Sequence, residues 1–261
     1  MSGWRLLDTG AHDGAWNMAC DVALMARARR TGETVLRVYA WEHPTLSFGR
    51  HEAARRQYDE QAIIAAGVGI VRRPTGGRAL LHHREVTYSI TAPLRDAESL
   101  TASVKRFNAL LLRALHHLGV PATEADTPRS LRPEGAACFA VPSAGELTLH
   151  GRKLVGSAQV RQDGALLQHG SILLDDDQGM IAGFARGAYI APAPAASLRE
   201  VLGDRATYSA VRDALMHAAT TERGAETPAA LVFSPEAATD GDPAFRDALA
   251  TFRDPGWTWR R

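Results

Sequence analysis

The chain is poor in cysteine: its 261 residues include only Cys20 and Cys138. Two cysteines exclude a disulfide framework, and residues 1–5 show no charged and apolar leader of the kind that directs secretion. Both absences predict a reducing, cytoplasmic compartment. No apolar run approaches the roughly 18 residues of a membrane span, so we expect no membrane association.

Several motifs of known chemistry are also absent. The sequence contains no His-Glu-x-x-His, no Cys-x-x-Cys and no Gly-x-x-x-x-Gly-Lys-Ser/Thr, which excludes zinc sites and nucleotide loops of those spacings. The adjacent His82 and His83 would face opposite sides of a strand, which argues against joint metal binding. We therefore expect neither a metal nor a cofactor.

Neither sign of charge is in clear excess, and the formal net charge of +1 indicates no class of partner. Locally, however, five arginines gather within a short span: Arg55, Arg56, Arg72, Arg73 and Arg78. They could form a basic face for an acidic protein or a phosphate group, although solvated surface arginines are an equal alternative for the first two. No run of aromatic residues interleaves them as stacking platforms would, so nucleic acid is not an expected partner.

What the chain does have is ordinary globular composition, with 45% hydrophobic and 23% charged residues. Apolar spacing and glycine stops predict helices, and apolar runs between turn residues predict strands. The expected helices cover residues 15–30, 58–66, 103–118 and 207–223, with further starts at Ser234-Pro235 and Asp242-Pro243. The expected strands include residues 35–41, 46–48 and 70–71, and a hairpin of 79–81 with 86–90.

The clearest prediction of local structure is for residues 146–174. Gly151 predicts a type II′ turn and Asp163-Gly164 a type I′ turn, giving three antiparallel strands over 146–149, 153–161 and 166–174. Alternation then places Lys153, Ser157 and Gln159 on one face. That face would suit the floor of a pocket, but a plain solvent face has the same pattern.

The two cysteines receive different interpretations. Cys20 belongs to a helical stripe with Met18, Val22 and Met25, so we expect it in the core. Cys138 follows a proline-containing irregular stretch, and long loops inside compact domains tend to be functional or disordered. The Lys153 ammonium could hold the Cys138 thiol as thiolate, whereas the alternative is that Cys138 is a small buried hydrophobe.

Three blocks carry a resemblance to the biotin and lipoate protein ligase superfamily. The first combines residues 72–82 with 85–89, the second is 151–159 and the third is 167–173, in order within a similarity that runs from about Asn17 to Leu174. The sequence most closely resembles the branch of cysteine-dependent octanoyltransferases. The segment with Cys138-Phe139, Pro142-Ser143 and Glu146-Leu147 resembles the nucleophile segment of that branch.

Two further positions refine the resemblance. Arg78 follows Gly76-Gly77 where ATP-using lipoate ligases usually have a third glycine. His83 stands where the family commonly has an aspartate, which leaves the local polar network open.

The resemblance implies an α+β fold, the class II biotin/lipoyl synthetase-like catalytic domain with mixed, largely antiparallel sheets flanked by helices. It also implies a single catalytic domain over residues 1–261, without an accessory C-terminal domain, acting as a monomer. The implied reaction is the first step of lipoate biosynthesis: an octanoyl group moves from acyl carrier protein to a lysine of the glycine cleavage H protein through a thioester on Cys138, assisted by Lys153. The substrate-binding residues that the resemblance implies are Arg72, Arg73, Gly76, Gly77, Arg78, His82, Gly156, Ser157, Gln159, His169 and Gly170.

Three alternatives stay open at this point. An ATP-dependent lipoate ligase would use Arg72, Arg73 and Lys153 to hold an acyl adenylate. An amidotransferase would move the acyl group between lipoyl domains through the same cysteine. A non-catalytic relative would bind lipoyl domains and lose nothing on Cys138→Ala.

Overall fold

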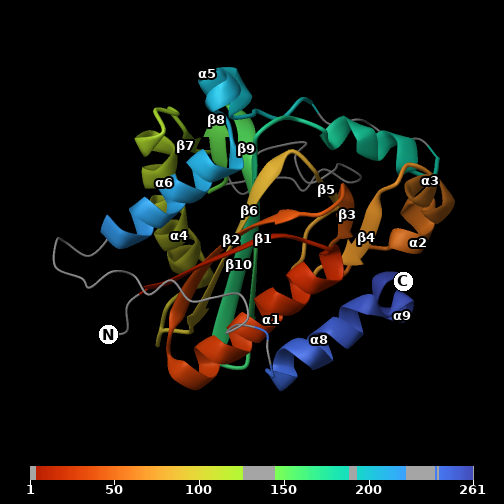
Figure 1. Cartoon of the computed structure of the whole chain (residues 1–261), viewed down its shortest axis with the longest axis horizontal. Helices are drawn as coiled ribbons and strands as arrows, with labels where there is room; N and C mark the ends of the chain where they lie inside the picture. The colour runs from red at the N-terminus through yellow and green to blue at the C-terminus, as the bar shows by residue number, and fades with distance from the viewer. Residues whose placement is uncertain (1–3, 126–144, 188–192, 222–238, 240, 261) are drawn as a thin grey trace.

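The computed structural model describes residues 4–125, 145–187, 193–221, 239 and 241–260 (Figure 1). Cys138 and the helix start expected at Ser234-Pro235 lie outside the described residues. None of the helices in the described part of the chain combines the length and the apolar character that crossing a bilayer requires.

Two sheets form the framework. The seven-stranded sheet has the order β1 (Trp4–His12), β2 (Thr34–Trp41), β6 (Glu85–Pro93), β10 (Ala165–Leu173), β9 (Arg152–Gln162), β8 (Leu147–Leu149) and β7 (Thr123–Glu124), and only β1 and β2 pair in parallel. The three-stranded sheet has the order β4 (Gly69–Arg72), β3 (Thr45–Phe48) and β5 (Leu80–His82). The sheets are thus mixed and largely antiparallel, as expected.

Helices flank the large sheet on both faces. The long helices are α1 (Gly14–Thr31), α4 (Leu100–His117), α6 (Tyr208–Thr221) and α8 (Pro243–Arg253). The short ones are α2 (Ala54–Gln57), α3 (Glu60–Ala65), α5 (Arg199–Leu202) and α9 (Pro255–Thr258), with 3-10 turns η1 (Gln178–Phe184) and η2 (Gly203–Arg205). In Figure 1, α4 and α6 lie together on one side of the large sheet, and α1 and α8 lie on the other.

The alternation of β6 explains this arrangement. Val86, Tyr88 and Ile90 belong to the apolar core that includes α4 and α6. The residues between them are polar and equally buried, and they face α1: Ser89, for example, donates a hydrogen bond to Asp21 of α1. Because successive side chains of a strand face opposite sides, one face of the large sheet is a conventional core and the other holds buried polar groups.

Most expected elements are confirmed, including the helices over 15–30 and 103–118 and the meander of β8, β9 and β10. The hairpin expected from 79–81 with 86–90 is wrong. Both strands exist, but β5 pairs with β3 in the small sheet and β6 pairs with β2 and β10 in the large one. His83 and Arg84 connect them, so this short connection passes from one sheet to the other.

The turn before β9 also differs from expectation. His150 and Gly151 are its two central residues, with φ of 51° and 75°. Positive φ at both positions defines type I′ rather than type II′, and histidine is among the residues that tolerate the left-handed region. Asp163 and Gly164 form the expected type I′ turn, with φ of 52° and 80°.

Candidate active site

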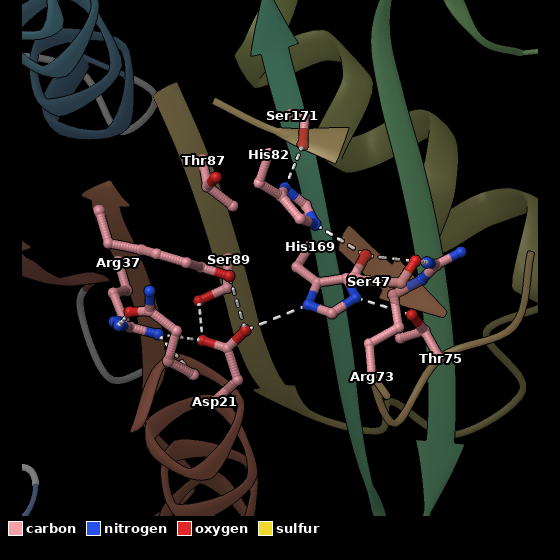
Figure 2. A network of polar contacts seen from close by, with 12 residues as sticks. Asp21, Arg37, Ser47, Arg73, Thr75, His82, Thr87, Ser89, His169 and Ser171 are labelled. Atoms are coloured by element: carbon pink, nitrogen blue, oxygen red, sulfur yellow. Dashed lines mark hydrogen bonds and ion pairs between the residues drawn. The ribbon is translucent and has the colours of Figure 1, made fainter. Parts of the chain in front are cut away.

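Buried polar side chains fill the space between the α1 face of the large sheet and the small sheet (Figure 2). The set comprises Asp21, Arg37, Ser47, Arg73, Thr75, His82, Glu85, Thr87, Ser89, His169 and Ser171. Buried charges and hydroxyls are costly unless they are paired and hydrogen-bonded. Their concentration in one layer therefore marks this region as the candidate site.

Asp21 anchors one half of the network. Its Oδ1 accepts hydrogen bonds from Arg37 Nη1 at 2.7 Å and Ser89 Oγ at 2.7 Å, and its Oδ2 lies 3.1 Å from His169 Nδ1. Burial acts to raise the pKa of Asp21, but the charge of Arg37 and the hydrogen bond from His169 outweigh it, and the pKa is lowered. Asp21 is therefore a carboxylate at neutral pH.

His82 anchors the other half. Its Nδ1 lies 2.8 Å from Glu85 Oε1 and its Nε2 lies 2.8 Å from Ser47 Oγ, while its ring stacks on Trp41 at a centroid distance of 3.9 Å. Burial lowers the pKa of His82 against the opposing effect of Glu85. His82 is therefore neutral at neutral pH, with Nδ1–H donating to the carboxylate.

Arg73 shapes the loop that follows β4. Its Nη1 donates to Ser47 O at 3.0 Å, and its Nη2 donates to Gly76 O at 2.9 Å and to Arg78 O at 2.7 Å. The loop thus closes around the guanidinium, and Gly77 at its tip is exposed. Gly77 has φ of 101°, a conformation that glycine adopts readily.

Arg72 faces a different part of the molecule. Its guanidinium is fully buried and donates to the carbonyl oxygens of Gly49, Thr258 and Arg260. Arg72, the last residue of β4, therefore connects that strand to the end of the described chain. Arg73, one residue later, organises the loop.

Lys153 lies on the polar side of the large sheet. It pairs with Thr148 across the ladder, and directly paired residues share a face. Thr148 alternates with Leu147 and Leu149, which both belong to the core around α4 and α6, so Thr148 and Lys153 face the opposite side. The Lys153 side chain is 2% exposed, and its Nζ lies 2.6 Å from Glu146 Oε1.

Ser157 and Gln159 face the other way. Ser157 Oγ lies 2.7 Å from the hydroxyl of Tyr88, and Gln159 Oε1 accepts a hydrogen bond from Ser103 of α4. The expectation that these residues share a face with Lys153 is wrong. The physical reason is a register shift between β8 and β9 next to Lys153, because the extra residue of a β-bulge changes the phase of the alternation.

The remaining expected site residues divide between the two faces. His169 contacts Asp21, and Gly156 pairs with Ser171 on the polar side. A Cβ on Gly170 would instead lie 2.8 Å from the Tyr88 ring, which places that position on the face toward α4. The structure therefore places the α1 side of the sheet next to Arg73, Gly76, Gly77, Arg78, His82, Gly156, Lys153 and His169, and it places Ser157, Gln159 and Gly170 on the side toward α4.

A cleft of about 330 Å³ opens beside the Arg73 loop, between α1, α8 and the turn of β9 and β10. Its lining includes Pro74 of the loop, Val160 of β9 and Arg29 of α1. Val160 lies seven residues from Lys153 on the same strand, roughly 23 Å at the rise of an extended chain. The end of the cleft at Val160 is therefore distant from the lysine.

Sequence reasoning missed Asp21, Ser47, Thr75 and Glu85. A signal existed for Asp21, an acidic residue inside an apolar helical stripe, and for Glu85, which opens a strand whose alternate residues are Thr87 and Ser89. Cys20, in contrast, is buried in the core as expected, and burial raises the pKa of its thiol to about 11.

Comparisons with known sequences agree on one family. A model of the lipoyl protein ligase A/B catalytic domain matches residues 13–220. Among curated relatives, the octanoyltransferase LipM of Kyrpidia tusciae is 47% identical over 186 residues, covering 68% of each chain. The octanoyltransferase LipM of Moorella thermoacetica is 38% identical over 283 residues, covering 99% of this chain and 98% of the relative.

Solved structures show the same fold. A lipoate-protein ligase A bound with ATP has a TM-score of 0.79 at 19% identity and covers 99% of both chains. A bi-partite lipoate protein ligase from Thermoplasma acidophilum has a TM-score of 0.77 at 17% identity, covering 99% of this chain and 97% of the other. The identities are too low to carry more than the fold, but the family match spans most of the sequence. The chain belongs to the lipoyl protein ligase A/B catalytic domain family.

Proposed function

We propose that the chain is an octanoyltransferase of lipoate biosynthesis. It moves an octanoyl group from acyl carrier protein to a lysine of a lipoyl-accepting protein, the glycine cleavage H protein, through a thioester on Cys138. Curated octanoyltransferases at 38–47% identity support the reaction. The observation that carries the proposal is the buried Lys153 ammonium on the same side of the sheet as His82, His169 and the Arg73 loop.

In the first half-reaction, the Cys138 thiolate attacks the carbonyl carbon of the donor thioester. The bond from that carbon to the phosphopantetheine sulfur breaks, the octanoyl group remains on Cys138 Sγ, and the departing thiolate takes up a proton. The Lys153 ammonium favours the Cys138 thiolate and stabilises the oxyanion, with backbone amides near Gly156 and Ser157 as further donors. Because the donor thioester is already activated, the step needs no ATP.

In the second half-reaction, the amine of the acceptor lysine attacks the Cys138 thioester. An amide forms, Cys138 leaves as a thiolate, and the attacking nitrogen loses its proton. Glu146 Oε1 lies 2.6 Å from Lys153 Nζ, and this ion pair holds the ammonium in place as a fixed cation in both half-reactions.

The remaining residues receive roles from their positions. The exposed Gly77, with Gly76 and Arg78, forms the mouth for the two substrate arms, and His82 and His169 lie behind it. Arg72 supports the loop through the backbone carbonyls that it contacts. Ser157, Gln159 and Gly170 face α4, so we assign them to the support of β9 and β10.

Of the alternatives, an ATP-dependent ligase would need Arg73 to hold an acyl adenylate. Each of the three guanidinium nitrogens of Arg73 already donates to a neighbouring oxygen atom, which favours the ATP-independent reaction. An amidotransferase would use the same cysteine, and only its donor differs. An octanoylated lipoyl domain offered as donor in place of acyl carrier protein separates the two activities.

The first experiment is the intact mass of the protein after mixing with octanoyl acyl carrier protein without ATP. We expect one octanoyl adduct that hydroxylamine removes. Cys138→Ala should abolish it, and Cys20→Ala should leave it unchanged because that side chain is in the core. An adduct that persists in Cys138→Ala, or one that requires ATP, would contradict the proposal.

A further inference from the structure

A hydrogen-bond chain of three side chains links the large sheet to the loop after β4. Asp21 Oδ2 lies 3.1 Å from His169 Nδ1, and His169 Nε2 lies 2.7 Å from Thr75 Oγ1. Figure 2 shows His169 between the other two residues. All three are buried, and Thr75 immediately precedes Gly76.

The charge of Asp21 fixes the proton position at one end of this hydrogen-bond chain. Asp21 is ionised and can only accept a hydrogen bond, so His169 Nδ1 carries the proton and donates it. At the other end, a hydroxyl can donate or accept, so Thr75 Oγ1 pairs with His169 Nε2 at 2.7 Å in either role. The charge at Asp21 thus sets the direction of the hydrogen bond at Nδ1, and the Thr75 hydroxyl completes the connection at Nε2.

Asp21 and Thr75, the two ends of this hydrogen-bond chain, differ in the structure around them. Asp21 is fixed on α1 by the ion pair with Arg37 and by Ser89. Thr75 belongs to an irregular loop, in which its carbonyl accepts a hydrogen bond from the amide of Arg50 at 2.8 Å. Of the two ends, Thr75 is therefore the one that lies outside regular secondary structure.

We infer that Asp21 and His169 are positioning residues that act through the Thr75 hydroxyl to hold the Gly76–Gly77 segment ready for the acyl donor. The inference rests on the proposed function only in that the donor binds at this loop. It assigns a role to Asp21, which lies outside the three blocks, and to Thr75, which lies in the first block but is not among the site residues that the resemblance implies.

A second hydrogen-bond chain ends on the same loop. Glu85 contacts His82, His82 contacts Ser47, and Ser47 Oγ accepts a hydrogen bond from Arg73 Nη1 at 3.1 Å. Each chain thus runs from a carboxylate through a histidine to a hydroxyl. Two such connections fix the loop at Arg73 and at Thr75, one on each side of Pro74.

Thr75→Val is the most selective test, because it removes the hydroxyl, keeps the shape and leaves the Asp21–Arg37 ion pair intact. Loss of one buried hydrogen bond corresponds to about a tenfold change in an equilibrium. If the bond sets the fraction of the loop that is ready for the donor, the apparent donor affinity falls by that factor. Saturating donor restores the bound conformation, so kcat stays nearly unchanged.

The protein offers a matched control in Thr91→Val. Thr91 is 1% exposed on β6, and its hydroxyl has no hydrogen-bond partner among the described residues. This variant removes the same atoms from the same kind of buried site without breaking a hydrogen bond. Thr75→Ser is the conservative variant, because it keeps the hydroxyl that the inference requires.

The experiment measures kcat and KM for octanoyl acyl carrier protein in wild type and the three variants. We expect KM to rise about tenfold in Thr75→Val, with wild-type values in Thr75→Ser and Thr91→Val. Amide hydrogen exchange at Gly76 and Gly77, measured on the same samples, should accelerate in Thr75→Val alone.

The outcomes separate the inference from the proposed function. A wild type without turnover would refute the proposed function before the variants are compared. A wild type that turns over, with an unchanged KM and unchanged exchange in Thr75→Val, would overturn the inference. A lower melting temperature in Thr75→Val with unchanged KM and exchange would overturn it as well, because it would show that the bond supports only the fold.

Discussion

Lys153 shows how much one residue depends on its local backbone. Strand alternation alone places it with Ser157 and Gln159, but the register shift next to it turns it to the opposite face, away from the core around α4 and α6. A bulge depends on the pairing of two strands, so nothing in the sequence of β9 by itself signals it. The resemblance predicts Lys153 as a site residue, whereas the face of the sheet on which it lies was not predictable from spacing.

If Lys153 is the cation that favours the Cys138 thiolate, Lys153→Ala should slow iodoacetamide labelling of Cys138 at neutral pH. The rate should recover as pH rises, because hydroxide then produces the thiolate without the ammonium. Labelling rate against pH in a Cys20→Ala background is the measurement.

The sequence provides a matched control, because Lys105 is the other lysine of the chain and is exposed on α4. Lys105→Ala should label like wild type. An unchanged labelling profile in Lys153→Ala would show that the lysine acts only on the acceptor.

At the scale of elements, helices and strands were largely predictable, and their pairing was not. The stripes of α1 and α4 and the turns around β9 carry local signals: Asp13 and Ser99 cap the helices, and Gly32 closes α1. The assignment of β5 and β6 to different sheets depends on contacts with β3 and β10, which are distant in sequence. The polar layer between the sheets follows from that assignment, so Ser47 and Thr75 were not predictable as site residues.

The approach of β3 to the Arg73 loop makes a prediction at this scale. A Cβ at Gly49 would lie 1.9 Å from the carbonyl oxygen of Gly77, which real contacts do not allow. Gly49→Ala should therefore displace the loop, cost about 1–3 kcal/mol of the free energy of unfolding and raise the donor KM.

Gly179→Ala is the control, because a Cβ there has no heavy atom within 4 Å. Urea denaturation and steady-state kinetics should show near wild-type values for Gly179→Ala. A Gly49→Ala variant with wild-type stability and KM would contradict the account of this loop.

At the scale of the whole molecule, the end of the described chain supports the small sheet. Trp259 packs on Phe48 at a centroid distance of 5.2 Å, and Arg72 donates to the carbonyls of Thr258 and Arg260. The loop that carries Gly76 and Gly77 therefore depends on residues almost 200 positions away in sequence. This dependence has no local sequence signal.

Trp259 is 5% exposed, and truncating a buried tryptophan to alanine costs about 3–5 kcal/mol. Trp259→Ala should lower the free energy of unfolding by that amount, and any activity that remains should show a raised donor KM. Thermal or urea denaturation is the measurement.

Leu100→Ala is the comparison, since that side chain is 52% exposed and its loss should change stability by less than about 0.5 kcal/mol. Equal effects of the two variants would refute the supporting role of the C-terminal segment.

The central claim is that the octanoyl group passes through Cys138 on its way to the acceptor. The most direct measurement isolates the octanoyl-enzyme, free of donor and ATP, and mixes it with unmodified glycine cleavage H protein in a single turnover. The account predicts that the octanoyl group leaves Cys138 and appears as a hydroxylamine-resistant amide on the acceptor at the same rate, fast enough to support steady-state turnover. An octanoyl-enzyme that stays loaded while the complete reaction proceeds would contradict it.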